Sequence, residues 1–322
     1  MDRFENIPEM ALAWHRAGTG AVLATVIQTW GSAPRRVGAQ LGISGAGDLV
    51  GSVSGGCVEG AVVVEALEAL SEQKCRVLEF GVSDGDAFAV GLACGGTIRI
   101  LLEPIGEVLS AGLLADLVAA RYSREPTAYV VHLDTGARRL EITGHGSQFR
   151  MDRSGFSADG QSFVAIHNPP LRLVIVGAVH IAQALVVMAR LAGYDPILID
   201  PRDSFASEVR FPGETMLLDW PEDALETVGL DARTALVLLT HDPKLDDPAI
   251  KRALMSQAFY IGALGSKRTH AMRVERLVAD GFKPAQIDRI HGPIGLDIGA
   301  AGPSEIAVSI MAEMTRVLRQ GQ

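Results

Sequence analysis

The fold is decided by two adjoining stretches of sequence, Leu171-Arg-Leu-Val-Ile-Val176 and Gly177-Ala-Val-His-Ile-Ala182. The first is an almost continuous apolar run, which is typical of a strand covered on both faces of a parallel sheet. The second predicts a tight turn from that strand into a helix over Gln183–Ala192. A strand, a glycine turn and a helix in this order indicate the start of a Rossmann-type unit.

Strands and helices alternate from this start to the end of the chain. Two prolines in Asn168-Pro-Pro170 interrupt regular structure just before it, so we expect one domain over residues 1–168 and a second over residues 169–322. The alternation predicts a doubly wound parallel sheet in the second domain. Its expected strands are Arg172–Val176, Asp195–Ile199, Thr215–Leu217, Thr234–Leu239, Phe259–Ile261 and Arg289–His291.

The first half of the chain has the pattern of a mixed α+β domain. Its expected helices are Glu9–Ala17, Val58–Ser71 and Leu109–Arg121. Its expected strands are Ala21–Ile27, Ala39–Ile43, Asp48–Val53, Arg76–Phe80, Thr97–Glu103 and a hairpin through Thr127–Leu133 and Arg138–Ile142. The polar stretch 150–160 is typical of another hairpin. The sequence therefore predicts an α/β protein with an N-terminal α+β domain followed by a Rossmann-like domain.

Composition and charge exclude several classes of function. The net charge of −9 over 322 residues disfavours nucleic acid and anionic membranes as partners, because both attract basic surfaces. No run approaches the roughly 18 apolar residues of a membrane span, and the first residues are acidic where a signal peptide is basic. We therefore expect a cytoplasmic protein. Three cysteines make no disulfide framework in such a compartment.

The turn after the first Rossmann strand has part of a dinucleotide fingerprint. Gly177 opens the turn, but Val179 stands where the G-x-G-x-x-G pattern has its second glycine. Asp200, about 20 residues further on, could accept the ribose hydroxyls of NAD(P), and Arg202 could meet a phosphate. An ordinary crossover turn explains the same residues. The incomplete fingerprint thus leaves open a nucleotide-like ligand and disfavours NAD(P)-driven hydride transfer.

Three loops follow later strands, Leu239–Pro243, Gly262–His270 and Gly292–Gly299, and the last two contain glycines. Carboxyl ends of parallel strands meet at one edge of the sheet, where such folds bind ligands, so we expect these side chains to converge there. Backbone amides with Arg and Lys suit phosphate, which favours a phosphorylated or pterin-phosphate ligand. Separate solvated charges are the alternative. The residues concerned are His241, Lys267, Arg268, His270 and His291.

Cys57 is the cysteine with the strongest functional signal. It follows Gly55 and Gly56 and precedes a helix, a placement in which the helix dipole and free amides lower a thiol pKa. We expect it to contact a soft metal or to carry sulfur. Cys94 precedes a second glycine pair and could do the same, whereas Cys75 has the sequence context of a small buried residue.

Two common chemistries find no support in the motifs. No C-x₂-C pair or nearby His doublet offers zinc four ligands, and no Ser-His-Asp or G-x-S-x-G constellation indicates a hydrolase. The sequence therefore predicts no catalytic residues.

Four unusual strings together resemble the XdhC/CoxI family, the accessory factors of xanthine and carbon monoxide dehydrogenases. The strings are Thr25-Val-Ile-Gln-Thr-Trp-Gly-Ser-Ala-Pro-Arg35, Gly51-Ser-Val-Ser-Gly-Gly-Cys-Val-Glu59, Gly262-Ala-Leu-Gly-Ser-Lys-Arg-Thr-His270 and His291-Gly-Pro-Ile-Gly-Leu-Asp-Ile-Gly299. The resemblance implies a maturation factor, not an enzyme, that binds molybdenum cofactor and protects it. It also implies sulfuration with a cysteine desulfurase and delivery to an apo molybdenum hydroxylase. The family usually has glycine before His180, so Val179 is a departure.

Three hypotheses remain open at this point. The first is a chaperone for molybdenum cofactor, in its plain molybdopterin form or its cytosine dinucleotide form. The second is an NAD(P)-dependent oxidoreductase, and the third is an assembly scaffold that contacts the desulfurase and the target without holding cofactor. A homodimer is expected because it is the commonest homo-oligomer.

Overall fold

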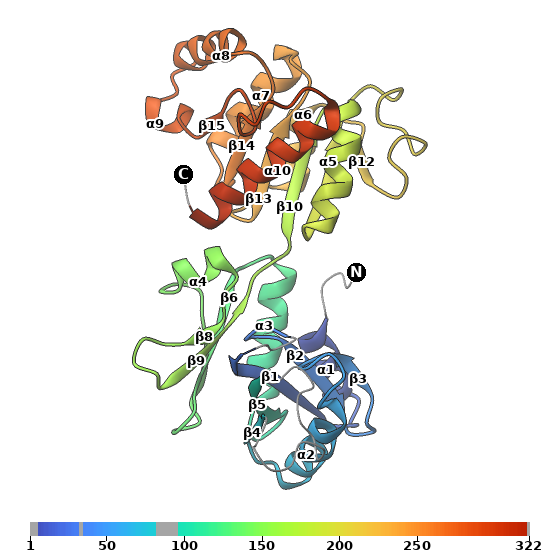
Figure 1. Cartoon of the computed structure of the whole chain (residues 1–322), viewed down its shortest axis with the longest axis vertical. Helices are drawn as coiled ribbons and strands as arrows, with labels where there is room; N and C mark the ends of the chain where they lie inside the picture. Colours follow the sequence, from blue (N-terminus) through green and yellow to red (C-terminus); the bar gives the residue numbers. More distant parts are fainter. Residues whose placement is uncertain (1–5, 32–34, 82–95, 321–322) are drawn as a thin grey trace. The chain divides into compact units, whose positions relative to one another are not determined.

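The computed structural model describes residues 6–31, 35–81 and 96–320, and the chain divides into two compact units, residues 1–169 and residues 170–322 (Figure 1). The second unit contains a six-stranded parallel sheet of order β12-β11-β10-β13-β14-β15. This is the strand order of a Rossmann fold, so the predicted fold class is confirmed. The strands are β10 (Leu171–Val176), β11 (Tyr194–Ile199), β12 (Thr215–Leu217), β13 (Thr234–Leu238), β14 (Tyr260–Ala263) and β15 (Ile290–His291).

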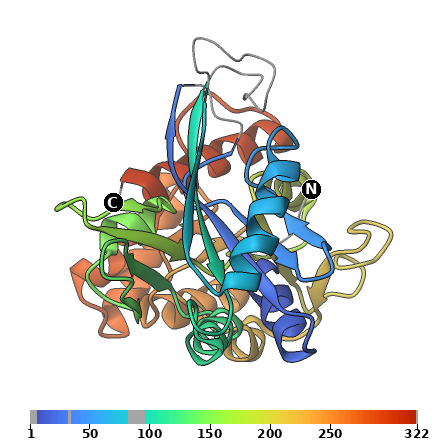
Figure 2. The same ribbon diagram turned by 90° about the horizontal axis from the view of Figure 1, so that it is seen from below.

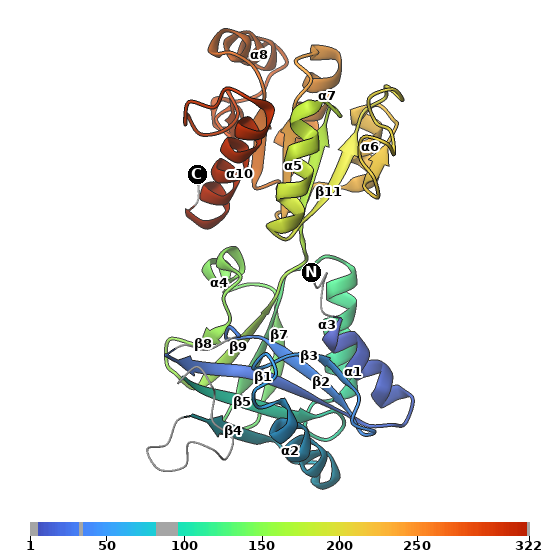
Figure 3. The same ribbon diagram turned by 45° about the vertical axis from the view of Figure 1, so that its right-hand side comes forward.

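Helices cover both faces of this sheet because its central strands are apolar on both sides. In β10, Leu173 and Ile175 pack towards α5 and α10, whereas Val174 and Val176 pack towards α6 and α7. Each buried side chain of this size contributes about 1.5–3 kcal/mol. Figures 1 and 3 show α5 and α10 side by side. The helices are α5 (His180–Leu191), α6 (Pro221–Val228), α7 (Pro243–Leu254), α8 (Lys267–Ala279), α9 (Pro284–Ile287) and α10 (Pro303–Gln320).

The first unit contains two antiparallel sheets, as a mixed α+β domain predicts. One has the order β3-β2-β1-β5-β4 and the other β7-β6-β9-β8. The strands are β1 (Ala21–Trp30), β2 (Gln40–Ser44), β3 (Leu49–Gly51), β4 (Arg76–Phe80), β5 (Thr97–Pro104), β6 (Thr127–His132), β7 (Arg138–Glu141), β8 (Gly155–Phe156) and β9 (Ser162–His167). The helices are α1 (Ile7–Arg16), α2 (Glu59–Glu72), α3 (Ala111–Tyr122) and α4 (Gly146–Met151).

The two faces of the five-stranded sheet are covered differently. Val62 and Ala66 of α2 share one core with Ile100 of β5, and Figure 2 shows α2, in light blue, alongside the long strands β1 and β5. On the other face, Leu23 and Leu101 share a core with α1, α3 and the four-stranded sheet. The sheet is thus buried on both sides, and the loop between β3 and α2 lies at its margin.

Two elements of the first unit differ from the expectation. The stretch 150–160 contains the end of helix α4 as well as strand β8, and β9 was not expected. The helix is only six residues long, and a single turn and a half leaves little periodicity to detect.

Candidate functional site

The turn between β10 and α5 requires glycine at its first position. Gly177 has a φ of +105°, and a Cβ there would lie 2.6 Å from Cγ2 of Thr240. Val179 is the N-cap of α5 in extended backbone, and its side chain packs against the core. The residue that replaces the second fingerprint glycine therefore has a packing role. His180 follows as the exposed first residue of α5.

Asp200 comes directly after β11, and its carboxylate is engaged inside the unit. The side chain is buried and accepts four hydrogen bonds: 2.9 Å from the Ala178 amide, 3.0 Å from the Arg202 amide, and 2.8 and 2.7 Å from the Arg202 guanidinium. Burial alone would raise the pKa of Asp200, but these hydrogen bonds outweigh burial and lower it. A carboxylate has roughly four acceptor sites, so this geometry leaves little for ribose hydroxyls.

The segment after Asp200 folds back over the same turn. Arg210 donates from Nη1 to the carbonyl oxygen of Ala178 at 2.7 Å and to that of Phe205 at 2.6 Å. The guanidinium carbon of Arg202 lies 4.0 Å from the centre of the Phe205 ring, a cation–π contact. These two cations therefore help to hold the turn, although the side chain of Arg202 remains 40% exposed.

His241 follows β13 in a backbone conformation that is rare for residues other than glycine, with φ at +65°. On one side, Oγ1 of Thr240 donates to Oδ1 of buried Asp246. On the other side, Asp242 caps α7 by accepting the N–H of Lys244 at 3.0 Å. The exposed imidazole is thus presented by a backbone outlier that its neighbours hold in place.

Helix α8 begins with cations where a helix usually prefers anions. Ser266 caps it by accepting the N–H of Thr269 at 3.1 Å, and Lys267 and Arg268 are its exposed first two residues. No acidic residue lies in the first turn. The helix dipole makes the N-terminus positive, so each cation there is unfavourable by about 0.3–1 kcal/mol unless an anion compensates it.

Arg273 of the same helix is a site residue that the sequence analysis missed. It is 2% exposed, donates from Nη2 to the carbonyl oxygen of Leu264 at 3.2 Å, and lies 3.5 Å from Oδ2 of Asp246. Among the described residues, its Nε and Nη1 have no hydrogen-bond partner. Burial lowers the pKa of Arg273 and raises the pKa of Asp246.

His270 packs against the loop that follows β15. Its ring lies so close to Gly292 that a Cβ on that glycine would collide with Nδ1. Burial, with the charge of Arg273, lowers the pKa of His270. The ring is therefore neutral near pH 7 and supplies one donor and one acceptor, not a charge.

His291 belongs to a buried polar network centred on Glu313 of α10. The carboxylate of Glu313 accepts a hydrogen bond from the hydroxyl of Tyr260 at 2.7 Å and one from the N–H of Gly295 at 2.8 Å. Nδ1 of His291 lies 3.4 Å from Oε1 of the same carboxylate. Burial opposes ionisation of Glu313, but these contacts outweigh it and hold its pKa at about 2. The His291 ring stacks on that of Tyr260 with centres 4.7 Å apart. This network also escaped the sequence analysis.

Two of the predicted residues of the second unit, Gly177 and His270, lie along one series of close neighbours at this edge of the sheet. Gly177 lies close to Thr240, Thr240 donates to Asp246, and Asp246 faces Arg273. The charge of Arg273 acts on His270, and His270 packs against Gly292.

In the first unit, Cys57 is exposed in the loop between β3 and α2. The helix begins at Glu59 with Val58 as its N-cap, so Cys57 lies two residues before the first helical residue. Gly55 and Gly56 have φ of +73° and +110°, which only glycine adopts readily. The loop therefore turns sharply and presents Cys57 to solvent.

The carboxylate of Glu59 holds this loop, and the sequence analysis missed it. It accepts the amides of Ser54 at 2.9 Å and Gly56 at 2.8 Å, the hydroxyl of Ser52 at 2.7 Å, and the hydroxyl of Ser54. Burial would raise the pKa of Glu59, but these hydrogen bonds outweigh burial and lower it to about 2. The amides of Ser54 and Gly56 are therefore not free to meet an anion or a thiolate.

Of the other two cysteines, the structure describes Cys75 but not Cys94. The expectation that Cys75 is buried is wrong, because the residue is exposed. Its sulfur nevertheless lies on the inner side of the residue and faces the buried Glu103–Arg138 pair. The partial burial of the sulfur, together with the charge of Glu103, raises the pKa of the thiol. Cys94 lies outside the described residues.

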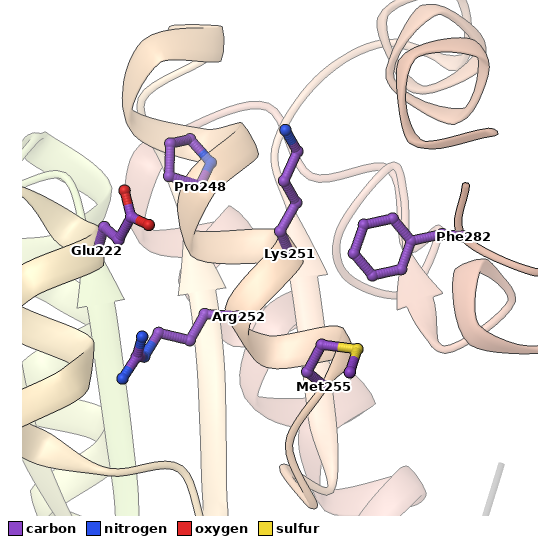
Figure 4. A pocket seen from close by; sticks show the side chains of 6 residues that line it. All are labelled: Glu222, Pro248, Lys251, Arg252, Met255 and Phe282. Atoms are coloured by element: carbon purple, nitrogen blue, oxygen red, sulfur yellow. The ribbon is translucent and has the colours of Figure 1, made fainter. Parts of the chain in front are cut away.

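A pocket of about 380 Å³ lies along α7, apart from all the residues named above (Figure 4). It is lined by Glu222, Pro248, Lys251, Arg252, Met255 and Phe282. Lys251 pairs with Asp280 at 2.8 Å and Arg252 approaches Glu226 at 3.6 Å. The pocket thus offers few free polar groups to orient a ligand.

Residues 6–31, 35–81 and 96–320 contain no group of three His, Cys, Asp or Glu side chains placed to hold a metal ion. No helix in the same ranges is both long enough and apolar enough to cross a membrane.

Comparison with known proteins places this geometry in a family. A profile described as the XdhC Rossmann domain matches residues 173–314, and one described as the XdhC and CoxI family matches residues 14–81. Molybdenum cofactor insertion chaperone PaoD of Escherichia coli is 31% identical over 98% of this chain and 89% of its own length. A Bacillus subtilis protein named as a probable component of xanthine dehydrogenase is 28% identical over 93% of this chain and 94% of its own length.

A solved structure supports the same relationship. The crystal structure of a xanthine dehydrogenase from Bacillus halodurans has a TM-score of 0.66 and 27% identity, and the match covers 98% of this chain and 96% of that one. The family resemblance read from the sequence is thereby confirmed. With both profiles in order and a relative above 30% identity along nearly the whole chain, the protein belongs to the XdhC and CoxI family.

Proposed function

We propose that this protein is a chaperone that binds molybdenum cofactor as cargo, protects it and inserts it into an apo molybdenum hydroxylase of the xanthine dehydrogenase type. The observation that carries the proposal is the 31% identity, over 98% of the chain, with a relative named as a molybdenum cofactor insertion chaperone. The second relative, named for xanthine dehydrogenase, suggests the class of recipient.

The second unit supplies groups that fit the anionic pterin-phosphate part of this cargo. Cations and helix N-termini bind phosphate through charge and amide donors. Nε and Nη1 of buried Arg273 have no hydrogen-bond partner among the described residues, which supports a ligand acceptor at this edge of the sheet. The residues proposed to contact the cofactor here are Gly177, His180, Arg202, His241, Lys267, Arg268, His270 and His291. Asp200 is proposed to act indirectly, by holding the turn after β10 and Arg202 through its four internal hydrogen bonds.

The first unit supplies a thiol that fits the soft part of the same cargo. Cys57 is exposed and set by Gly55 and Gly56, and thiolates prefer soft metals and sulfur. We assign it contact with the molybdenum or with its terminal sulfur, and Cys94 is proposed as a second such residue. A cysteine desulfurase as sulfur donor and a second copy of the chain complete the proposed partners.

The test is to purify the protein from cells that make molybdenum cofactor and to oxidise what it releases to a fluorescent pterin. We expect stoichiometric pterin, restoration of activity to an apo molybdenum hydroxylase, and loss of both in Cys57→Ala. Release of CMP on hydrolysis would identify the cytosine dinucleotide form. Cys75→Ala, at the other described exposed cysteine, is the matched control and should behave as wild type.

Two outcomes would replace the proposal. Absence of pterin and of rescue, with binding of the desulfurase or the target intact, would favour a scaffold. The Rossmann strand order makes an NAD(P)-dependent oxidoreductase the second candidate, although Asp200 already has four internal donors. Saturable binding of NAD(H) or NADP(H) below millimolar concentration, with turnover, would support that candidate.

A further inference from the structure

We propose that the N-terminal end of α8 is a binding subsite for a phosphate monoester, with buried Arg273 as its innermost donor. The inference deepens the proposed function and rests on it only for the identity of the molecule that carries the phosphate. Lys267, Arg268 and His270 are the other side chains of the subsite.

The first turn of α8 has donors without acceptors. Ser266 satisfies the N–H of Thr269 through its side chain at 3.1 Å and that of His270 through its carbonyl oxygen at 2.9 Å. Within residues 6–31, 35–81 and 96–320, the amides of Lys267 and Arg268 have no acceptor. Free amides at the positive end of a helix dipole form a ready anion site.

Arg273 provides the independent observation. Its side chain leans back along the helix, as helical side chains do, and reaches the carbonyl oxygen of Leu264 just before α8 begins. The guanidinium therefore lies at the same end as Lys267 and Arg268. A guanidinium is always charged at neutral pH, and native proteins rarely bury such donors unsatisfied. The unpaired Nε and Nη1 in the described part of the chain call for an acceptor that a ligand oxygen would supply.

The charge balance at this end favours a dianion. Buried Arg273 is faced by one carboxylate, that of Asp246, at 3.5 Å, and no ion pair in the described ranges involves Lys267 or Arg268. The adjacent Asp247 is already paired with Arg276 through contacts of 2.6 and 2.9 Å. Three cations and a helix dipole against one carboxylate leave an excess of positive charge that a phosphate monoester, with about −1.5 to −2 charges at pH 7, would balance.

The connection between β14 and α8 is suited to admit a ligand to the buried guanidinium. Gly265 lies in it at φ +144°, a conformation that other residues rarely adopt. Residues 264–266 are the only chain between the last residue of β14 and the first of α8. Because Nε and Nη1 of Arg273 are buried, a phosphate oxygen reaches them only if these three residues move, and the proposal includes that movement.

The test titrates the full chain with inorganic phosphate and with phenyl phosphate by calorimetry, and maps protected amides by hydrogen exchange. We expect one saturable site with protection over residues 267–270. Arg273→Lys keeps the charge beside Asp246 but loses donors, and should weaken phosphate binding at least about tenfold. Arg276→Lys is the matched control, the same change three residues on at a saturated ion pair, and should bind as wild type.

A second variant keeps the inference testable if Arg273→Lys fails to fold. Lys267→Ala combined with Arg268→Ala changes only exposed side chains, and should weaken phosphate and reduce the salt dependence of binding. Unchanged affinity in both folded variants, or protection elsewhere in the chain, overturns the inference. Acetate should compete poorly, because a monoanionic carboxylate balances less charge.

The source of the phosphate is separated by comparing released cofactor pterin before and after phosphatase treatment. Equal binding of the two forms overturns the subsite and leaves the proposed function standing. If the protein binds phosphate at α8 but never acquires pterin in cells, the subsite is supported and the proposed function is refuted.

Discussion

Glu59→Gln removes the charge that holds the Cys57 loop, and its cost can be worked from the structure. The carboxylate accepts hydrogen bonds from Ser52, Ser54 and Gly56. A pKa lowered from 4.5 to about 2 corresponds to roughly 3 kcal/mol at most. Because water reaches this carboxylate and screens it, we reduce the expected loss in free energy of unfolding of the first unit to about 1–2 kcal/mol at pH 7.

The sign of the pH dependence follows from the direction of the shift. The pKa of Glu59 is lower in the folded than in the unfolded state, so its stabilisation is complete above pH 4.5. It is lost as the pH falls from 4.5 towards 2. The difference between wild type and Glu59→Gln should therefore be constant from pH 7 to about pH 5 and should shrink below that.

Urea unfolding followed by tryptophan fluorescence measures this difference. Trp14 and Trp30 lie in the first unit and Trp220 in the second, so a Trp220→Phe background restricts the signal to the first unit. Glu68→Gln on the same helix is the control: its carboxylate is 58% exposed and pairs with Arg76. It should change stability by less than about 0.5 kcal/mol.

One result would refute the reasoning about Glu59. If Glu59→Gln is as stable as Glu68→Gln at pH 7, or if its deficit persists unchanged at pH 3, the carboxylate does not hold the loop in its ionised form. Alkylation of the thiol provides a second readout, because a loosened loop changes the rate at Cys57 but not at Cys75.

Three further predictions concern single side chains. Gly177→Ala should destabilise the second unit by more than about 2 kcal/mol in urea unfolding, because its φ is +105° and its Cβ would strike Thr240. Tyr260→Phe should cost about 1–3 kcal/mol by the same measurement, because it removes a buried donor to a charged carboxylate. Wild-type stability of that unit should fall between pH 4.5 and pH 2, since the pKa of Glu313 is about 2, and Glu313→Gln should flatten this profile.

The strands of the Rossmann unit were predictable because their signal is local. The apolar run Leu171–Val176 needs no knowledge of its neighbours to be identified as a buried strand, and its observed bounds match. The loops that follow such strands were predictable for the same reason, since parallel strands place their carboxyl ends at one edge. His241 and Lys267 each follow a parallel strand, and that position in the sequence was enough to predict that they lie at this edge.

The buried charges were not predicted because each depends on a partner far away in sequence. Asp246 and Arg273 belong to different helices, and a charged residue on a helix is by default assigned to solvent. A signal was nevertheless present: each occupies a position of the apolar stripe, four residues from Ile250 and Leu277 respectively. Glu313 likewise occupies a buried position on the apolar stripe of α10. A charge on an apolar stripe predicts a buried polar network.

The role of Glu59 was not predicted for a different reason: its hydrogen-bond partners are amides of its own loop. Whether those amides point at a side chain depends on the left-handed backbone of Gly55 and Gly56, which composition does not specify. The string Ser-Gly-Gly-Cys alone therefore predicts free backbone amides near a thiol. In the structure, the carboxylate of Glu59, two residues after Cys57, accepts hydrogen bonds from two of those amides, so they are not free.

This contrast assigns different chemistry to the two glycine loops. Before α2, the amides of Ser54 and Gly56 already bind an internal carboxylate, so an incoming anion would have to displace a group with a pKa of about 2. Before α8, no acid occupies the first turn, and Lys267 adds positive charge to it. A phosphate therefore gains more at α8 than at α2. What the loop before α2 has left to offer a cofactor is the sulfur of Cys57, and binding through sulfur needs no free amide.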